Sequence, residues 1–407
     1  MANVVEIAFD LSGDPNLNFA TLDDPVKGIL GSTTYVLGGA LLIDVTDKVI
    51  GYRITRGKSR QLDRYPSGRL SVILDNNDRT FDPLYDASPY AGQIIPRRDV
   101  QIRSEDIIQY RGVIDDWNLN YSPNGKSEAE IVASDSLTIL ANQALPAGTA
   151  TSQFSGERVT AILDDPSVNW PTDKRNIETG QQTLQADVIE AGTNALEYLQ
   201  LVTASEPGSL FIGKQGNLTF KDRQTDQSSA DVLLLADDGT GVPYQNIQVV
   251  YGAELLYNQV IVSRLNGGTA TANNLDSQTT YGITTLTLSD LLMDSDADAQ
   301  DLADFLVLKY SEPEYRFETV TVILDTITAE QREDVLGLEL GDTVQVKFTP
   351  NDIAPAISRY AEIIRINQTV TQTSHSVTLG LASLDFSFWR LSDAVFGRLS
   401  SGNSLAY

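Results

Sequence analysis

Short apolar runs, separated by glycine, proline, asparagine and aspartate, dominate the first 145 residues of the chain. They occupy residues 4–9, 35–37, 40–45, 49–54, 71–74, 100–103, 109–120 and 128–133. Within the run 49–54, polar and apolar positions alternate, so that Arg53 lies off the apolar face of the strand. Short strands at this spacing are typical of an antiparallel barrel or sandwich. We therefore predict a β domain, either a barrel or a sandwich, over residues 1–145.

The pattern changes after residues 146–151, a linker rich in alanine, glycine, proline and threonine. Asn194 and Glu197 predict a capping box at the start of a helix, and Gln215-Gly216-Asn217 predicts a β-hairpin. A shorter helix is expected over 155–163. The apolar face of the longer helix has the i, i+3, i+4, i+7 spacing and consists of Ala195, Tyr198, Leu199 and Val202. We assign residues 146–235 to a small α/β domain.

Strand-like runs return in the last part of the chain and predict a second β-rich domain over residues 236–385. They occupy residues 247–251, 258–264, 282–288, 317–324, 341–348, 360–370 and 376–381. One helix is expected around Ala299–Leu306, after a cap at Asp294-Ser295-Asp296. Residues 267–274, rich in glycine, threonine, alanine and asparagine, are expected to form a flexible loop.

The last strands resemble those of the first barrel. Residues 340–346 align with residues 97–102, and Val100 lies 244 positions before Val344. In both places a long strand and then a shorter one follow. A separation this large is far beyond a solenoid period. We interpret the chain as mainly β (α+β), with two antiparallel β-barrel domains of one kind and a small α/β insertion between them.

The 407 residues suffice for two to four domains, and 41% hydrophobic with 21% charged residues is typical of an ordered protein. The chain has no cysteine, no apolar run of about 18 residues and no signal-peptide pattern, so we expect neither disulfides nor membrane contact. The net charge is −26, which disfavours tight DNA binding. The acidic charge either keeps the protein soluble or forms a surface along which DNA slides without adhering.

Residues 51–103 have the opposite charge. They contain ten Lys/Arg and six Asp/Glu, a local +4, which leaves −30 for the rest of the chain. We predict that this stretch faces a protein neighbour, because acidic chains need such a counter-charge to pack together. The alternative is a solvated loop with scattered arginines. The proposed contact residues are Arg53, Arg56, Lys58, Arg60 and Arg64.

A second candidate interface is the C-terminal segment 386–407, which is too apolar for a free tail. Aromatic side chains dominate interface energetics, so we expect this segment to dock on another chain or on an adjacent domain. Packing on the last barrel of the same chain is an equal alternative. The anchoring residues are expected to be Phe386, Phe388, Trp389 and Phe396.

Candidate catalytic and metal-binding residues are few. His375 is the only histidine, and without a second histidine or a cysteine we expect a half-exposed strand residue. Asp294, Asp296 and Asp298 have the spacing of calcium ligands but lack the turn glycine and the bidentate glutamate, so we interpret them as a helix N-terminus. Asp75, Asn77 and Asp86 are interpreted as a turn. We expect no cofactor, no metal and no enzymatic activity, although a carboxylate pair for glycoside hydrolysis stays open.

Residues 52–103 contain an ordered set of short motifs. They are GKSRQLDR (57–64), LDN (74–76), FDP (81–83) and SPY (88–90), and related segments occur at 24–31, 205–223, 312–317 and 340–344. In this order and spacing they resemble a signature of phage minor tail proteins of the baseplate hub kind, from long-tailed non-contractile phages. The turn 76–79 lacks a glycine that this signature often contains.

The resemblance implies a structural virion protein, assembled in the host cytoplasm, that forms a ring at the distal end of the tail. It implies a homotrimer in contact with the tail tube or distal tail protein, the tape measure protein, and tail fibre or tip proteins. DNA would pass through the ring without specific binding. Two other functions stay open, namely a tail-associated polysaccharide or peptidoglycan hydrolase and a receptor-binding tip module. The tryptophans Trp117, Trp170 and Trp389 serve either as a sugar platform or as core and interface residues.

Overall fold

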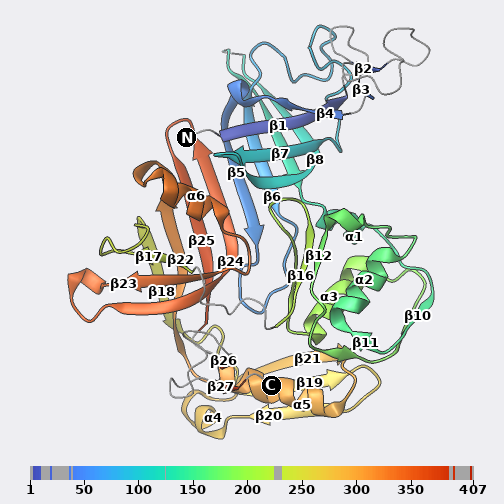
Figure 1. Cartoon of the computed structure of the whole chain (residues 1–407), viewed down its shortest axis with the longest axis vertical. Coiled ribbons are helices and arrows are strands. Elements are labelled where there is room, and N and C mark those ends of the chain that lie inside the picture. The colour runs from blue at the N-terminus through green and yellow to red at the C-terminus, as the bar shows by residue number, and fades with distance from the viewer. Residues whose placement is uncertain are drawn as a thin grey trace.

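The computed structural model describes residues 3–10, 19–20, 36–37, 40–123, 125–223, 232–384, 388–389 and 404–405. Two β units form one continuous sheet along the long axis of the molecule, and two smaller α/β units lie beside and below it (Figure 1). The predicted fold class, mainly β with a small α/β insertion (α+β), is confirmed. In the described part of the chain, no helix has both the length and the apolar character that a membrane span needs.

The first β unit contains seven strands in the order β5-β6-β9-β8-β7-β1-β4, and every neighbouring pair is antiparallel. Alternate residues of these strands point to one side and form a continuous apolar core, which includes Ile54, Val72, Val100 and Ile131. The strands are β1 (Asn3–Asp10), β4 (Ala40–Asp44), β5 (Val49–Gly57), β6 (Arg69–Asp75), β7 (Asp99–Ser104), β8 (Ile107–Tyr121) and β9 (Ser127–Ser134). The 3-10 helix η1 (Thr46–Lys48) connects β4 to β5, and β2 (Phe19–Ala20) pairs with β3 (Val36–Leu37).

The second β unit has the order β18-β22-β25-β24-β23-β17. Its pairs are antiparallel except β23 with β17, and it has its own apolar core. The strands are β17 (Leu233–Ala236), β18 (Asn246–Gly252), β22 (Glu314–Ile323), β23 (Thr343–Phe348), β24 (Ile357–Thr371) and β25 (His375–Ser383). Helix α6 (Ala329–Gly337) and the 3-10 helices η3 (Leu324–Thr326) and η4 (Pro350–Asp352) complete the unit.

Five strands correspond between the two β units. The orders β5-β6-β9-β8-β7 and β18-β22-β25-β24-β23 are the same, and so is the order of these strands along the chain. Strands β7 and β23 each have 6 residues, and β8 and β24 each have 15. A bulge interrupts the pairing at Ile114/Asp116 in the first unit and at Ile363/Arg365 in the second. The two units are therefore built on one plan.

The first α/β unit follows β9 and lies to the right in Figure 1. Its helices pack around an apolar core that includes Leu163, Leu199 and Phe220. The helix and the hairpin predicted for this region are confirmed. The Asn194 side chain accepts a hydrogen bond from the Glu197 amide at 3.1 Å, which is one of the two bonds of the predicted capping box. The elements are α1 (Leu137–Ala141), β10 (Gly148–Ala150), β11 (Gln153–Phe154), α2 (Ser155–Asp164), η2 (Thr172–Lys174), β12 (Arg175–Ile177), β13 (Thr183–Leu184), β14 (Asp187–Ile189), α3 (Ala195–Ser205), β15 (Ser209–Ile212) and β16 (Leu218–Lys221).

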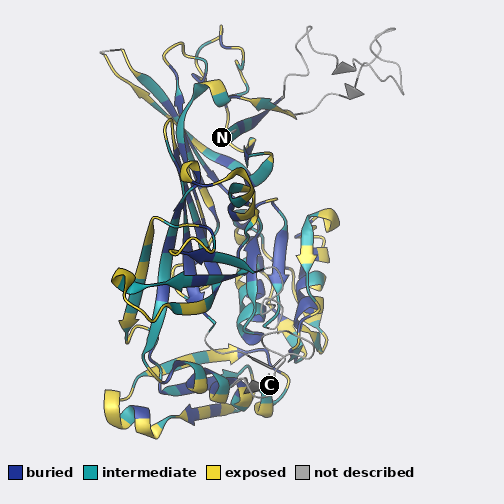
Figure 2. Ribbon diagram, turned by 60° about the vertical axis from the view of Figure 1, so that its left-hand side comes forward, coloured by how far each residue is buried: buried dark blue, intermediate teal, exposed yellow. Residues whose placement is uncertain are grey.

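The second α/β unit lies at the bottom of Figure 1 and was not expected as a separate body. The prediction of a flexible loop over 267–274 is wrong, because strand β20 (Thr269–Asn273) lies within these residues. Ala270 and Ala272 alternate with threonines, and the two alanines are buried in the core that helix α5 covers. The elements are β19 (Gln259–Arg264), β20 (Thr269–Asn273), α4 (Leu275–Tyr281), β21 (Thr285–Leu291) and α5 (Asp296–Tyr310). Figure 2 shows the buried residues concentrated along the strands and inside these units, with exposed residues at the loop tips.

Candidate assembly interface

The two β units meet where β5 pairs with the second half of β24. The pairing is antiparallel and runs from Gly57 opposite Arg365 to Gly51 opposite Thr371. Gly57 has a left-handed backbone with φ of +103°, and a Cβ atom there would lie 2.2 Å from the carbonyl oxygen of Ile364. The amide of the next residue, Lys58, donates to that same oxygen at 2.9 Å. Only glycine fits such a close approach of two backbones.

Arg56 holds three parts of the chain together at this junction. Its side chain is buried, and its guanidinium forms an ion pair with Glu339, in the turn between α6 and β23. It also donates to the carbonyl oxygen of Ile212, at the end of β15, at 3.3 Å. Arg56 therefore faces the interior of its own chain, and the prediction that it contacts a neighbouring chain is wrong for this residue. Alternation along β5 places it on the same face as the buried Tyr52 and Ile54.

Lys58 is also buried, with 8% of its surface exposed. Its ammonium lies 4.7 Å from the ring centroid of Tyr65, a cation–π contact. Burial lowers the pKa of Lys58, because desolvation disfavours the charged ammonium. This residue too contributes to the junction inside the chain and presents no surface to a partner, which corrects the prediction.

Three other residues of the basic stretch are exposed to solvent. Arg53 lies on the exposed face of β5. The Nε atom of Arg60 lies 2.8 Å from the Oε1 atom of Glu254, in an exposed ion pair. Arg64 donates to the Oε1 atom of Gln200, on α3, at 3.1 Å. The prediction of a protein-facing surface therefore stays a prediction for Arg53, Arg60 and Arg64.

Lys214 also lies at this junction, a position that was not predicted from the sequence. Its ammonium donates to the carbonyl oxygens of Leu336 at 2.9 Å and of Leu338 at 3.1 Å, at the C-terminal end of α6. A cation there satisfies free carbonyl groups and complements the helix dipole. The amide of Lys214 also donates to Glu339, the partner of Arg56, at 2.7 Å. Burial lowers the pKa of the Lys214 ammonium.

The structure describes the backbone of only two of the four residues proposed to anchor the C-terminal segment. Phe386 and Phe396 lie outside the described residues. Phe388 and Trp389 form strand β26 (Phe388–Trp389), which pairs in parallel with β27 (Ser404–Leu405). Their side chains are likewise outside the described part, so the docking of segment 386–407 stays a prediction.

His375 is fully buried, and the expectation of a half-exposed residue is wrong. Its Nε2 atom lies 3.2 Å from the Oε1 atom of Gln368, whose amide nitrogen donates to Gln109 at 2.6 Å. These three polar side chains form a connected series that extends from the second β unit to β8 of the first. Burial lowers the pKa of His375 to about 4, so the ring is neutral near pH 7.

The two acidic clusters have structural partners. Asp296 accepts hydrogen bonds from Arg264 at 2.5 Å and from the amide of Gly268 at 3.0 Å. Asp298 forms a capping box with Ser295 at the start of α5, as the predicted helix N-terminus requires. Asp75 accepts from the amide of Asn77 at 2.9 Å, in the predicted turn. Across the described ranges, no three metal-ligating side chains come together.

The loop 76–96 packs its aromatic residues onto the first β unit. The ring of Tyr90 stacks on Phe9 with 4.2 Å between centroids, and Phe81 lies 5.9 Å from Tyr90. Trp117 extends this group, and its Nε1 atom donates to the carbonyl oxygen of Ile95 at 3.1 Å. The SPY motif therefore anchors the loop to the core of the first unit.

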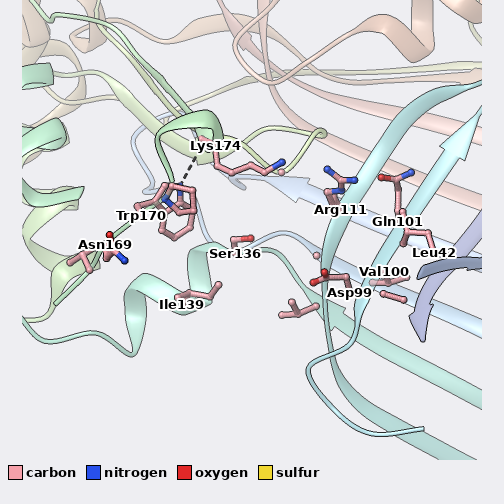
Figure 3. A pocket seen from close by; sticks show the side chains of 16 residues that line it. Leu42, Asp99, Val100, Gln101, Arg111, Ser136, Ile139, Asn169, Trp170 and Lys174 are labelled. Atoms are coloured by element: carbon pink, nitrogen blue, oxygen red, sulfur yellow. Dashed lines mark hydrogen bonds between the residues drawn. The ribbon is translucent and has the colours of Figure 1, made fainter. Parts of the chain in front are cut away.

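A cleft of about 540 Å³ separates the first β unit from the first α/β unit (Figure 3). Its walls are partly apolar, with Leu42 on β4 and Ile139 on α1. Trp170 and Lys174 lie on the same side of the cleft, and Lys174 extends across it towards Arg111 on β8 (Figure 3). Surfaces through which domains contact each other commonly combine apolar and charged groups in this way.

Two strand edges are open. Among the described strands, β18 pairs with β22 alone. Residues 116–121 of β8 pair with β9 on one side, while β7 extends only to Val113 on the other. Two large side chains are exposed beside these edges, with Tyr121 at 52% and Tyr251 at 69%. Unpaired edges are templates for pairing with another chain.

No protein-family model matches the chain, and no curated protein matches its sequence. Among solved structures, the chain is similar to the 43 kDa tail protein of prophage MuSo2 from Shewanella oneidensis and to the tail protein from Neisseria meningitidis MC58. Each shares 12% identical residues at a TM-score of 0.60 over 94% of this chain. The similarity covers 98% of the first protein and 96% of the second, so it shows a common fold over nearly their whole lengths.

Proposed function

We propose that this chain is a structural, non-enzymatic protein of the tail of a long-tailed phage or phage-like particle, and that it forms the hub ring at the distal end of the tail tube. The observation that carries this proposal is the pair of β units with one strand order, joined side by side through β5 and β24. The fold shared with two tail proteins supports the location in a tail.

The duplicated unit explains how one ring can meet two symmetries. A tail tube built of six-fold rings must join a tip that is commonly three-fold. Three copies of a chain with two similar β units present six of them, and closed rotational symmetry is the usual way to build such a ring. The homotrimer would contact the tail tube or distal tail protein and the tape measure protein on one side, and fibre or tip proteins on the other.

The net charge of −26 suits this role. An acidic wall repels the phosphate backbone, so DNA would pass through the ring without adhering during ejection. We place the protein in the virion, after assembly in the host cytoplasm. In this proposal, residues 1–145 and the barrel strands of 236–385 are the hub domains, and 146–235 is peripheral.

The test is the symmetry of the assembled ring. A three-dimensional map of the tail tip should show three copies of the chain, with the two β units of each copy at alternating positions of a pseudo-six-fold ring. Six copies per ring, or a location away from the tube axis, would overturn the proposal. A zymogram on peptidoglycan or host capsule separates it from the hydrolase alternative, because the proposed structural protein clears neither substrate.

The C-terminal segment has its own test. We propose that residues 386–407 dock onto a neighbouring chain or domain through Phe386, Phe388, Trp389 and Phe396. Deleting 386–407 should leave a folded protein that no longer enters particles. Normal incorporation of the truncated protein would show that the segment is dispensable.

A further inference from the structure

We infer that the open edge of β18 in one copy of the chain pairs antiparallel with residues 116–121 of β8 in a second copy. The pairing would repeat, between chains, the geometry that β5 and β24 form within one chain. This inference rests on the proposed ring, because it names the two edges through which its copies would meet.

Equivalent positions in the two β units follow from the register of their strands. In each unit, residues that face one another on neighbouring strands can be followed across four strands. These strands are β5-β6-β9-β8 in the first unit and β18-β22-β25-β24 in the second. The facing residues are Arg53–Ser71–Val132–Asp116 in the first unit and Gln248–Thr319–Gly380–Arg365 in the second. Strand β18 is therefore the counterpart of residues 51–57 of β5, and residues 116–121 of β8 are the counterpart of 365–370 of β24.

The second unit uses its β24 to bind β5, but no described strand of the first unit pairs with this edge of the counterpart segment of β8. Likewise β5 is paired on both sides, while its counterpart β18 has a described partner on one side only. Applying the β5–β24 register to the open edges places Asp116 opposite Gly252, Leu119 opposite Val249 and Tyr121 opposite Ile247. One chain therefore has both edges of the inferred contact, on β18 and on residues 116–121 of β8, and the described strands do not pair these edges with each other.

The side chains along the two edges agree with this register. One face of the new pair would bring Trp117, Leu119 and Tyr121 beside Tyr251, Val249 and Ile247, which are all apolar or aromatic. The other face would bring Asn118 and Asn120 beside Val250 and Gln248. Cross-strand aromatic and β-branched pairs stabilise a sheet. The contact would also cover the two exposed tyrosines, Tyr121 and Tyr251.

Charge also permits the contact, although both copies are strongly acidic. β18 has no charged residue, and within 116–121 the only one is Asp116, which would face Gly252. Like charges therefore do not oppose each other along the paired strands. Neither segment contains the lysine or proline that commonly protects an exposed edge strand from pairing. A closed ring of copies leaves no such edge.

The chain has no cysteine, so a designed disulfide tests the pairing directly. We would mix the full-length Asn120→Cys variant with the full-length Gln248→Cys variant and oxidise the mixture. Facing strand positions have the Cα spacing that a disulfide needs. We expect a covalent dimer of the two variants on a non-reducing gel, and covalent trimers when one chain carries both substitutions. The control mixes Asn120→Cys with Thr287→Cys, an exposed residue of β21 outside the β units, and should give little dimer.

Sedimentation of the same samples separates the two levels of the proposal. Chains that sediment as trimers but cross-link no better than the control overturn the edge pairing and leave the ring in place. Chains that stay monomeric at every concentration overturn the ring as well. As a second variant, Tyr251→Lys should weaken the trimer without unfolding the chain, because Tyr251 is 69% exposed, while Tyr281→Lys on α4 should leave it intact.

Discussion

Arg97 and Gly341 occupy the same position in the two β units. Both have a left-handed backbone, with φ of 67° and 84°. The amide of Arg97 donates to the carbonyl oxygen of Ile114 at 2.7 Å, and the amide of Gly341 donates to that of Ile363 at 2.7 Å. The duplication therefore extends to the turns that lead into β7 and β23.

The shared left-handed backbone predicts effects of different size for two substitutions. Gly341→Ala should destabilise the chain by about 1–2 kcal/mol, because a side chain makes the left-handed conformation costly. Arg97→Gly should change stability by less than about 1 kcal/mol, because relief of that strain offsets the greater freedom of glycine in the unfolded chain. The urea midpoints of the two variants check this. Equal losses in both would contradict the equivalence.

Gly57 should be the least replaceable glycine of the β5–β24 junction. In Gly57→Ala the new Cβ would lie 2.2 Å from the carbonyl oxygen of Ile364, so β24 must move. We expect a loss of at least about 2 kcal/mol, from the strained backbone and the steric overlap together. Gly92→Ala is the control, because Gly92 also has a positive φ (+74°) but no atom near its Cβ position. Thermal unfolding midpoints should separate the two variants clearly.

The buried ion pair between Arg56 and Glu339 predicts a large effect of removing one charge. Glu339→Gln removes the carboxylate that contacts the buried Arg56 guanidinium, and we expect a loss of about 3 kcal/mol. The same substitution at Glu254, the exposed partner of Arg60, should cost less than about 1 kcal/mol. Urea denaturation of both variants provides the comparison. Similar losses would show that the junction pair contributes no more than a surface pair.

Most strands of the two β units could be predicted from the sequence, because their apolar runs are a local pattern. Aligning Val100 with Val344 also aligns Arg97 with Gly341, the equivalence that the hydrogen bonds show. The burial of Arg56 has a weaker sequence signal. In an alternating strand, Arg56 lies on the same face as Tyr52 and Ile54. Its partner Glu339 lies 283 residues away, and no local pattern connects the two.

Strand β20 of the second α/β unit could not be predicted, because it contributes small residues to the core from a segment with the composition of a loop. Ala270 and Ala272 are buried only because helix α5 lies over β20. The burial of His375 was hidden for a similar reason. Its neighbours in sequence are threonine, glutamine and serine, while the groups that enclose it, Tyr52 and Gln368 among them, come from other strands.

His375 predicts how stability depends on pH. Burial lowers its pKa to about 4 from 6.5, so the unfolded chain binds a proton more readily than the folded one. The stability that His375 contributes is therefore complete above pH 6.5 and is lost as the pH falls towards 4. A shift of this size corresponds to about 3 kcal/mol. Urea midpoints measured across this range should fall steadily.

The variant His375→Gln isolates this contribution, because carboxylates also titrate at the lower end of the range. Asp325, which accepts a hydrogen bond from the His375 amide at 2.7 Å, is unchanged in the variant, and so are the other acidic groups. The difference in stability between wild type and variant should then shrink by about 3 kcal/mol between pH 7 and pH 4. A difference that stays constant with pH would mean that His375 is protonated as easily in the folded chain as in the unfolded one. In that case, burial would not control its charge.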